Sequence, residues 1–126
     1  MKQRIEALRQ SLAKSSLDAA LITSGVNIRY YSGFTSSDGI FLVTHKGAYL
    51  VTDFRYTIQA NAQTKGLCEV VEAPFTEQLD RIRAFLAAAT NVVIVPAAQG
   101  PAGLAGQARA LAARLAERGI AARVAD

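Results

Sequence analysis

Five carboxylates from four segments have the chemistry needed to hold a metal ion or to act as general acid and base: Asp18, Asp38, Asp53, Glu69 and Glu72. In a nuclease of ribonuclease-H type, acids on adjacent strands hold two magnesium ions. Asp53, however, precedes a helical pattern and Asp38 precedes a glycine, which favours a helix cap and a turn residue bonded to its own backbone. Glu69 and Glu72 differ in parity on one predicted strand, so they point to opposite faces. We therefore expect no active site of the chain's own, and a nuclease in which Asp18 and Asp53 meet is a minor alternative.

Nucleophiles and nucleotide-binding motifs are equally sparse. The only histidine, His45, adjoins a predicted turn without a carboxylate to orient it, which favours an exposed turn residue over a general base. The only cysteine, Cys68, falls in an apolar strand, as expected of a small buried side chain. Glycines at 100–106 follow a strand but lack the G-x-G-x-x-G spacing, and Pro101 removes an N–H that a pyrophosphate would need. The sequence thus predicts no zinc, iron–sulfur or dinucleotide site.

Composition narrows the class of protein further. The 126 residues are 51% hydrophobic and 19% charged, which indicates one folded domain over residues 1–126. The net charge is +4, but the basic residues are scattered, and the trio Arg109, Arg114 and Arg118 lies on a predicted helix without aromatic residues. Nucleic acid is therefore not an expected partner. No apolar run reaches the roughly 18 to 20 residues of a membrane span, and residues 1–11 are unlike a signal peptide, so we expect a cytoplasmic protein without a membrane partner.

Hydrophobic periodicity and turn residues divide the chain into alternating helices and strands. The predicted helices span residues 1–14, 28–33, 54–64, 76–89 and 102–118, and the predicted strands span residues 18–24, 40–45, 48–53, 67–73, 91–96 and 120–125. Asn27 is the expected cap of the second helix, and Thr52 or Asp53 that of the third. Lys46-Gly47 is expected to form a two-residue hairpin turn with Gly47 at positive φ. The order predicts a three-layer α/β fold, a mixed sheet of about six strands with helices on both faces.

One stretch carries a family pattern. It reads NIRYYSGFTSSDGIFLVT from residue 27 and AYLVTDFRYTIQA from residue 48, with an Asp-Gly pair, a hairpin and an Asp-x-Arg-Tyr motif in fixed order. This pattern resembles the amino-terminal domain of the creatinase, prolidase and aminopeptidase P family, and the other elements extend the resemblance over essentially the whole chain. The resemblance implies a ribonuclease-H-like α/β domain that lacks the catalytic acids of that fold.

The resemblance also implies what the chain does and what it lacks. Family members join this domain to a carboxy-terminal catalytic domain, where two divalent metals (Mn, Co or Zn) hydrolyse the bond before proline. None of those ligands has a counterpart here, so we expect the isolated chain to hold no metal or other cofactor and to be inactive. The expected partners are the catalytic domain, further copies in a homo-oligomer and a proline-containing peptide. A stand-alone binding or scaffold module remains an alternative, and the sequence does not distinguish aminopeptidase P from prolidase or creatinase.

By position in the family pattern, the loop that reaches a neighbouring subunit's active site comprises Phe34, Thr35, Ser36, Ser37 and Asp38. The resemblance implies that Phe34 contacts a substrate side chain or proline, and that Ser36, Ser37 and Asp38 bind a peptide terminus. A plain connector in which the Asp-Gly pair forms a turn is the alternative.

Asp53, Arg55 and Tyr56 form the Asp-x-Arg-Tyr motif. Because Arg55 opposes the dipole of the predicted helix, we expect a carboxylate partner for it, within the domain or across an interface.

Overall fold

The computed structural model describes residues 1–36, 38–86, 91–95 and 102–124, with the backbone alone for 102–108. The helices are α1 (Lys2–Lys14), α2 (Gly25–Ser32), α3 (Thr57–Gln63), α4 (Gln78–Phe85) and α5 (Ala102–Glu117), with a 3-10 turn at Phe75–Glu77. The strands are β1 (Ala19–Ile22), β2 (Gly39–Thr44), β3 (Ala48–Thr52), β4 (Glu69–Glu72), β5 (Asn91–Val95) and β6 (Ala121–Val124).

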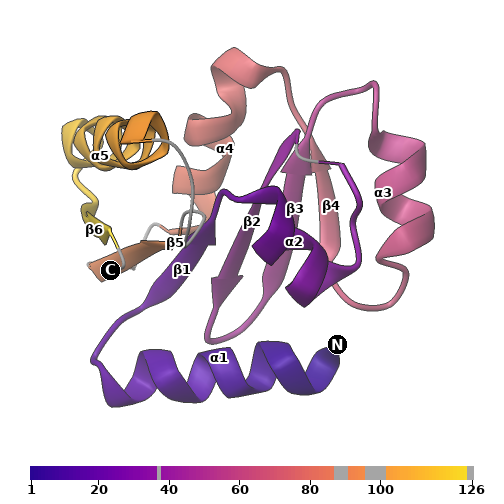
Figure 1. The fold of residues 1–126 in the computed structure, drawn as a ribbon, viewed down its shortest axis with the longest axis horizontal. Helices are drawn as coiled ribbons and strands as arrows, with labels where there is room; N and C mark the ends of the chain where they lie inside the picture. Colours follow the sequence, from indigo (N-terminus) through magenta and orange to yellow (C-terminus); the bar gives the residue numbers. More distant parts are fainter. Residues whose placement is uncertain (37, 87–90, 96–101, 125–126) are drawn as a thin grey trace.

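The six strands form one mixed sheet in the order β4-β3-β2-β1-β5-β6 (Figure 1). β2 is antiparallel to both of its neighbours, and the other pairs of adjacent strands are parallel. The strands other than β2 therefore all end at one end of the sheet, called here the carboxyl end. The opposite end, where a turn joins β2 to β3, is called the hairpin end.

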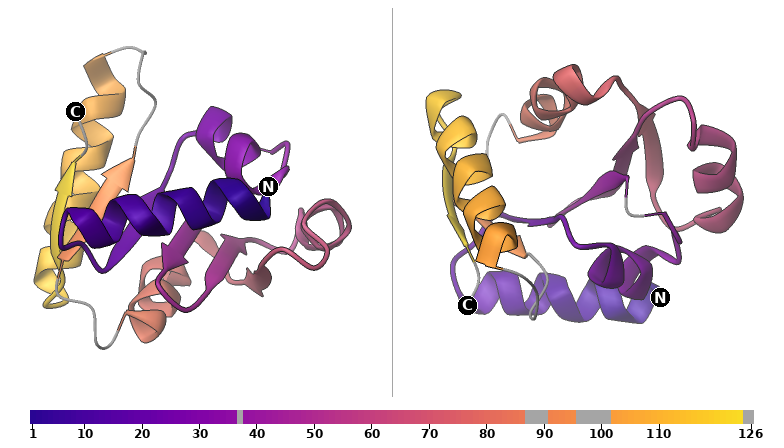
Figure 2. Two further views of the ribbon diagram at one scale, coloured as in Figure 1. Left: turned by 90° about the horizontal axis from the view of Figure 1, so that it is seen from below. Right: turned by 45° about the horizontal axis from the view of Figure 1, so that its top comes forward.

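Two apolar layers cover the two faces of this sheet. Ile5 of α1, Ile28 of α2 and Ala60 of α3 pack with one set of strand side chains. Ile82 of α4 and Leu115 of α5 pack with the other set. The views from other directions show the same three layers, with α1 and α2 on one side of the sheet and α4 on the other (Figure 2). The predicted three-layer α/β architecture is confirmed.

β1 shows why the pattern of this strand predicts its place. All four of its residues are buried. Ala19 and Leu21 belong to the layer under α4 and α5, whereas Ile22 belongs to the layer under α1 to α3. A strand covered on both faces needs apolar residues at every position rather than at alternate ones. The run of apolar residues after Asp18 therefore indicates a central strand.

Two local predictions were wrong. Ser24, not Asn27, caps α2, because its side chain accepts the N–H of Asn27 at 3.2 Å. Gly47 is not among the positive-φ residues, because the two turn residues are His45 and Lys46, and Gly47 pairs with Thr44, whose N–H donates to the Gly47 carbonyl at 2.9 Å. The Thr44 Oγ1 accepts the N–H groups of Lys46 and Gly47 at 3.3 and 3.0 Å. The cap glycine of α2 was predicted correctly, since Gly33 has φ +81°.

Candidate functional site

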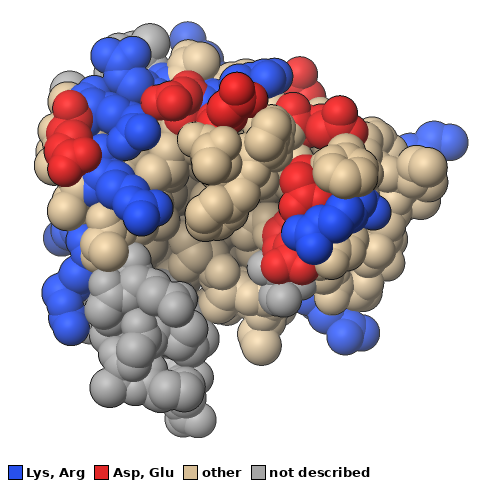
Figure 3. Space-filling view, turned by 90° about the horizontal axis from the view of Figure 1, so that it is seen from above, with Lys and Arg blue, Asp and Glu red and all other residues tan. Residues whose placement is uncertain are grey.

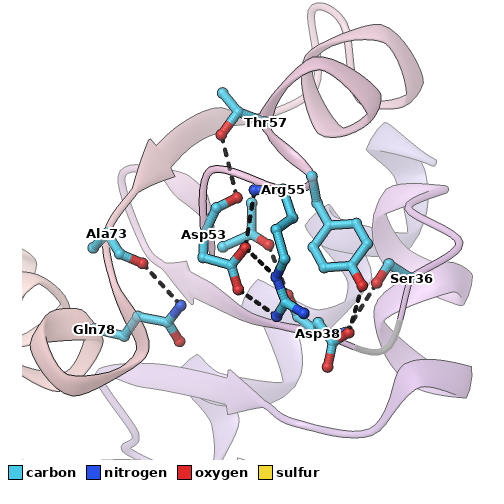
Figure 4. Close-up of polar contacts among 9 residues, drawn as sticks. Ser36, Asp38, Asp53, Arg55, Thr57, Ala73 and Gln78 are labelled. Atoms are coloured by element: carbon cyan, nitrogen blue, oxygen red, sulfur yellow. Dashed lines mark hydrogen bonds and ion pairs between the residues drawn. The ribbon is translucent and has the colours of Figure 1, made fainter.

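The turn after β3 is organised by an ion pair. Arg55 Nε and Nη2 donate to the two carboxylate oxygens of Asp53 at 2.9 and 2.7 Å, and the Arg55 backbone N–H donates to Asp53 Oδ1 at 3.0 Å (Figure 4). These hydrogen bonds are the main cause that holds the pKa of Asp53 below its ordinary value. The same pairing raises the pKa of Arg55. Asp53 thus fixes the direction of Arg55, which remains 56% exposed.

Tyr56 links this turn to the loop at residues 34–38. Its hydroxyl donates to Asp38 Oδ2 at 2.8 Å, and this bond is the main reason that the pKa of Tyr56 is raised. The Arg55 guanidinium carbon lies 5.0 Å from the centre of the Tyr56 ring. Arg55 therefore lies between two carboxylates, bonded to Asp53 and attracted by the charge of Asp38.

The Asp38 main chain is also held. Its carbonyl accepts the hydroxyl of Thr52 at 2.6 Å, and Thr52 is completely buried at the end of β3. The Asp38 N–H donates to Ser36 Oγ at 3.1 Å. The Asp38 carboxylate is exposed, while the backbone that carries it is fixed by the hydrogen bond to Thr52 of β3.

Two glutamines of α3 hold the first part of the loop. Gln63 Oε1 accepts the Thr35 N–H at 3.0 Å, while Gln59 and Gln63 both donate to Thr35 Oγ1, at 2.9 and 3.0 Å. We did not predict these two residues from the sequence. Their spacing of four residues, which puts two amides on one helix face, was the available signal.

Phe34 is the main correction among the predicted site residues. It is fully buried and packs with Phe41, Leu50 and Ala60 in the layer under α1 to α3. Its ring also meets the Tyr56 ring edge to face, with centroids 6.5 Å apart. The prediction that Phe34 contacts a substrate is therefore wrong for this structure, because its side chain anchors the loop and none of its surface is accessible.

Other predictions about this site also need correction. Asp53 does not cap α3, nor does Thr52, because the helix begins at Thr57 after the Asp53–Arg55 pair closes a turn. The Asp38 carboxylate accepts the Tyr56 hydroxyl, which differs from the expected bond to its own backbone. Ser37 lies outside the described residues, so its predicted role has no structural account.

The exposed part of the loop is polar. Asp38 is exposed and Ser36 is half-buried, and Arg55 lies beside them. Thr57 continues the polar surface by donating to Glu72 Oε1 at 2.6 Å, which joins the start of α3 to the end of β4. The arrangement can accept hydrogen bonds from a peptide or donate hydrogen bonds to it.

Three other residues considered for catalysis, His45, Cys68 and Asp18, lie apart from this site. His45 is exposed at the hairpin end, where its Nε2 lies 2.9 Å from the Leu17 carbonyl oxygen. Burial raises the pKa of Cys68, which disfavours a reactive thiolate. Asp18 precedes β1 at the hairpin end and Asp53 follows β3 at the carboxyl end, so the acids of the nuclease alternative do not meet.

The described residues form neither a metal site nor a membrane-spanning helix. Within the described part of the chain, no three His, Cys, Asp or Glu side chains are grouped so that they could hold a metal ion. None of the helices described is long and apolar enough to cross a membrane. Gly100 and Pro101 lie outside the described residues, and so do the side chains of 102–108.

The chain is similar to known proteins in family pattern, in sequence and in structure. The model of the creatinase/prolidase N-terminal domain matches residues 4–117. The uncharacterized peptidase YqhT of Bacillus subtilis (strain 168) is 44% identical over 69 residues, which is 55% of this chain and 19% of that protein. The chain therefore corresponds to a small part of the curated relative that it matches.

Solved structures agree in fold. An Xaa-Pro aminopeptidase structure from Streptococcus pyogenes superposes with a TM-score of 0.79 and 26% identity, over 98% of this chain and 90% of that one. The N-terminal domain of the cytoplasmic peptidase PepQ from Mycobacterium tuberculosis H37Rv superposes with a TM-score of 0.78 and 30% identity, over 98% and 93% of the two chains.

Proposed function

Because the chain belongs to the creatinase/prolidase N-terminal domain family, we propose that it is the non-catalytic domain of an Xaa-Pro aminopeptidase or prolidase. In this role it helps assemble the oligomer and narrows the substrate cleft of a neighbouring subunit. The relatives named as peptidases and aminopeptidases support the substrate class. The cytoplasmic description of the mycobacterial relative supports the same location for this protein.

The anchoring of the loop at residues 34–38 carries this proposal. Phe34 is buried beneath the loop, Thr52 and Tyr56 bond Asp38, and two glutamines bond Thr35. A loop that narrows a cleft must keep its shape when a peptide binds, because ordering a mobile loop would cost affinity. Its polar rim of Ser36, Asp38 and Arg55 suits the backbone and terminus of a short peptide.

The chemical step itself belongs elsewhere in this proposal. Two divalent metals (Mn, Co or Zn) would lie in a catalytic domain, where they activate water and polarise the scissile carbonyl. The described residues of this chain offer no group of ligands for them. We expect the purified 126-residue chain with added manganese or cobalt to cleave no proline peptide above background.

The test of cleft narrowing uses the full product of the gene and proline peptides of two to eight residues. Tyr56→Phe removes the hydroxyl that fixes Asp38 and leaves the ring against Phe34. We expect KM for the shortest peptides to rise several-fold with kcat nearly unchanged, and the preference for short over long peptides to fall. Thr44→Val at the hairpin end is the control. An unchanged length preference in Tyr56→Phe would contradict the proposal.

A further inference from the structure

Three large apolar side chains are exposed close to this site. Phe54 is 77% exposed, Ile58 is 88% exposed and Phe75 is 76% exposed. Single exposed apolar side chains are ordinary on protein surfaces, but a group of them marks a contact surface. The position of these three residues in the fold decides whether they are separate exposed side chains or one contact surface.

The pairing of β3 with β4 brings the three together. Thr52 and Glu72 are register partners at the ends of these parallel strands, and the Ala73 N–H donates to the Thr52 carbonyl at 2.9 Å. Phe54 follows Thr52 by two residues and Phe75 follows Glu72 by three. Ile58 adjoins Thr57, which bonds Glu72 at 2.6 Å. We call Phe54, Ile58 and Phe75 the apolar patch.

The size of the apolar patch fits the centre of an interface. An aromatic side chain carries roughly 150–250 Å² of surface, so these exposures amount to apolar area on the order of a few hundred Å². A stable interface buries about 800 Å² on each partner. The patch therefore requires a partner surface that extends well beyond it.

The border of the apolar patch is acidic, although the chain as a whole is basic. Asp38 and Asp53 lie beside Arg55, while Glu72 and Glu77 flank Phe75 in sequence. Figure 3, which looks onto this end of the molecule, shows acidic groups around exposed uncharged surface, with most basic groups to the left. Two copies meeting through this surface would bring like charges together, which disfavours a symmetric dimer.

We propose that the apolar patch seats the larger domain that full-length relatives carry in addition to this one, through an apolar surface bordered by Lys or Arg. This inference rests on the proposed function, which supplies the second domain. The matched segment is only 19% of the Bacillus peptidase, so most of that relative lies outside it.

The experiment compares the 126-residue chain with the full product of its gene by amide hydrogen exchange. We expect exchange in the segments 54–58 and 73–77 to be at least tenfold slower in the full product. The double variant Phe54→Ser, Phe75→Ser should lose that protection. Val26→Ser should keep it, because Val26 is 79% exposed but lies on α2, which follows β1 and packs mainly on β2.

The outcomes of this experiment distinguish a loss of docking at the apolar patch from a loss of folding and from a failure of the proposed function. In the isolated chain the double variant should keep its melting temperature within about 2 °C, because exposed side chains contribute little to stability. Equal exchange in the two proteins would overturn the inference, and so would a dimer of the isolated chain that the double variant abolishes. Absence of proline-peptide cleavage by the full product, with protection retained, would remove the proposed function but leave the docking surface.

Discussion

The hairpin turn at one end of the sheet and the loop at residues 34–38 at the other end differ in how their backbone groups are hydrogen-bonded. At the hairpin end, Thr44 alone satisfies the N–H groups of Lys46 and Gly47, so the turn is closed within four residues. At the carboxyl end, the loop at residues 34–38 depends on partners 14 to 28 residues away along the chain. The N–H groups of the hairpin turn are therefore satisfied locally, although Arg9 Nε and the Leu17 carbonyl also contact Thr44 and His45. The loop, by contrast, takes its shape from the packed domain.

The largest effect should come from Phe34→Ala. The substitution removes a fully buried aromatic side chain from beneath the loop and leaves a cavity. Large-to-small changes of this kind cost about 3–5 kcal/mol of unfolding free energy. His45→Ala at the hairpin end should cost less than about 0.5 kcal/mol, because the side chain is exposed. Urea unfolding of both variants measures the difference, and equal losses would contradict the contrast between the two ends.

A matched pair of threonines should give an intermediate effect. Thr52→Val removes a buried hydroxyl and leaves the Asp38 carbonyl without that donor, which costs about 1–3 kcal/mol. Thr44→Val frees two N–H groups at a turn that water reaches, so its cost should be near the lower end of that range. The midpoints of urea unfolding rank the two. A larger loss for Thr44→Val would reverse the comparison.

Most of the fold was predictable because its signals are short-range. Short runs of apolar residues bounded by polar or turn residues predicted the strands. The six-stranded α/β architecture followed from the order of helices and strands. The boundaries of α3 and β4 were less accurate. α3 begins at Thr57 and not at Phe54, since the preceding turn is closed by the Asp53–Arg55 pair. Competition between a cap and an ion pair for one carboxylate is not visible in a sequence.

The site was predictable in position but not in the role of its parts. The family pattern located the loop, whereas burial decided that Phe34 faces inward. An aromatic residue between a glycine and polar residues fits either an exposed contact or an anchor. Only packing against α3 and the sheet distinguishes the two. The same holds for Gln59 and Gln63, whose amides have meaning only once Thr35 lies opposite them.

A smaller effect concerns acid stability at the carboxyl end. Arg55 holds the pKa of Asp53 below its unfolded value, so the pair stabilises the fold at neutral pH. That contribution is present above the unfolded pKa, near 4, and is lost as pH falls through the lower folded pKa. In Asp53→Asn the decline of stability between about pH 5 and pH 2 should be shallower than in the wild type. Thermal unfolding across this range, with Glu69→Gln as control, measures the slope.

The smallest effect, and the most local, is the titration of Tyr56. The Asp38 carboxylate accepts the phenol proton and raises the pKa of Tyr56 above its ordinary value near 10. Because the folded state holds this proton more tightly, the stability from this bond is complete below pH 10 and falls as pH rises through the folded pKa.

In Asp38→Asn the phenol loses its charged acceptor, so we expect Tyr56 to ionise at lower pH than in the wild type. The ring-carbon NMR shift of Tyr56, assigned with Tyr56→Phe, follows this titration. Gln63→Ala is the matched control, since it removes a partner of Thr35 in the same loop and leaves the Asp38 carboxylate in place. An unchanged titration in Asp38→Asn would mean that the loop is not held by this bond. The contrast between the two ends would then rest on Phe34, Thr52 and the two glutamines that bond Thr35.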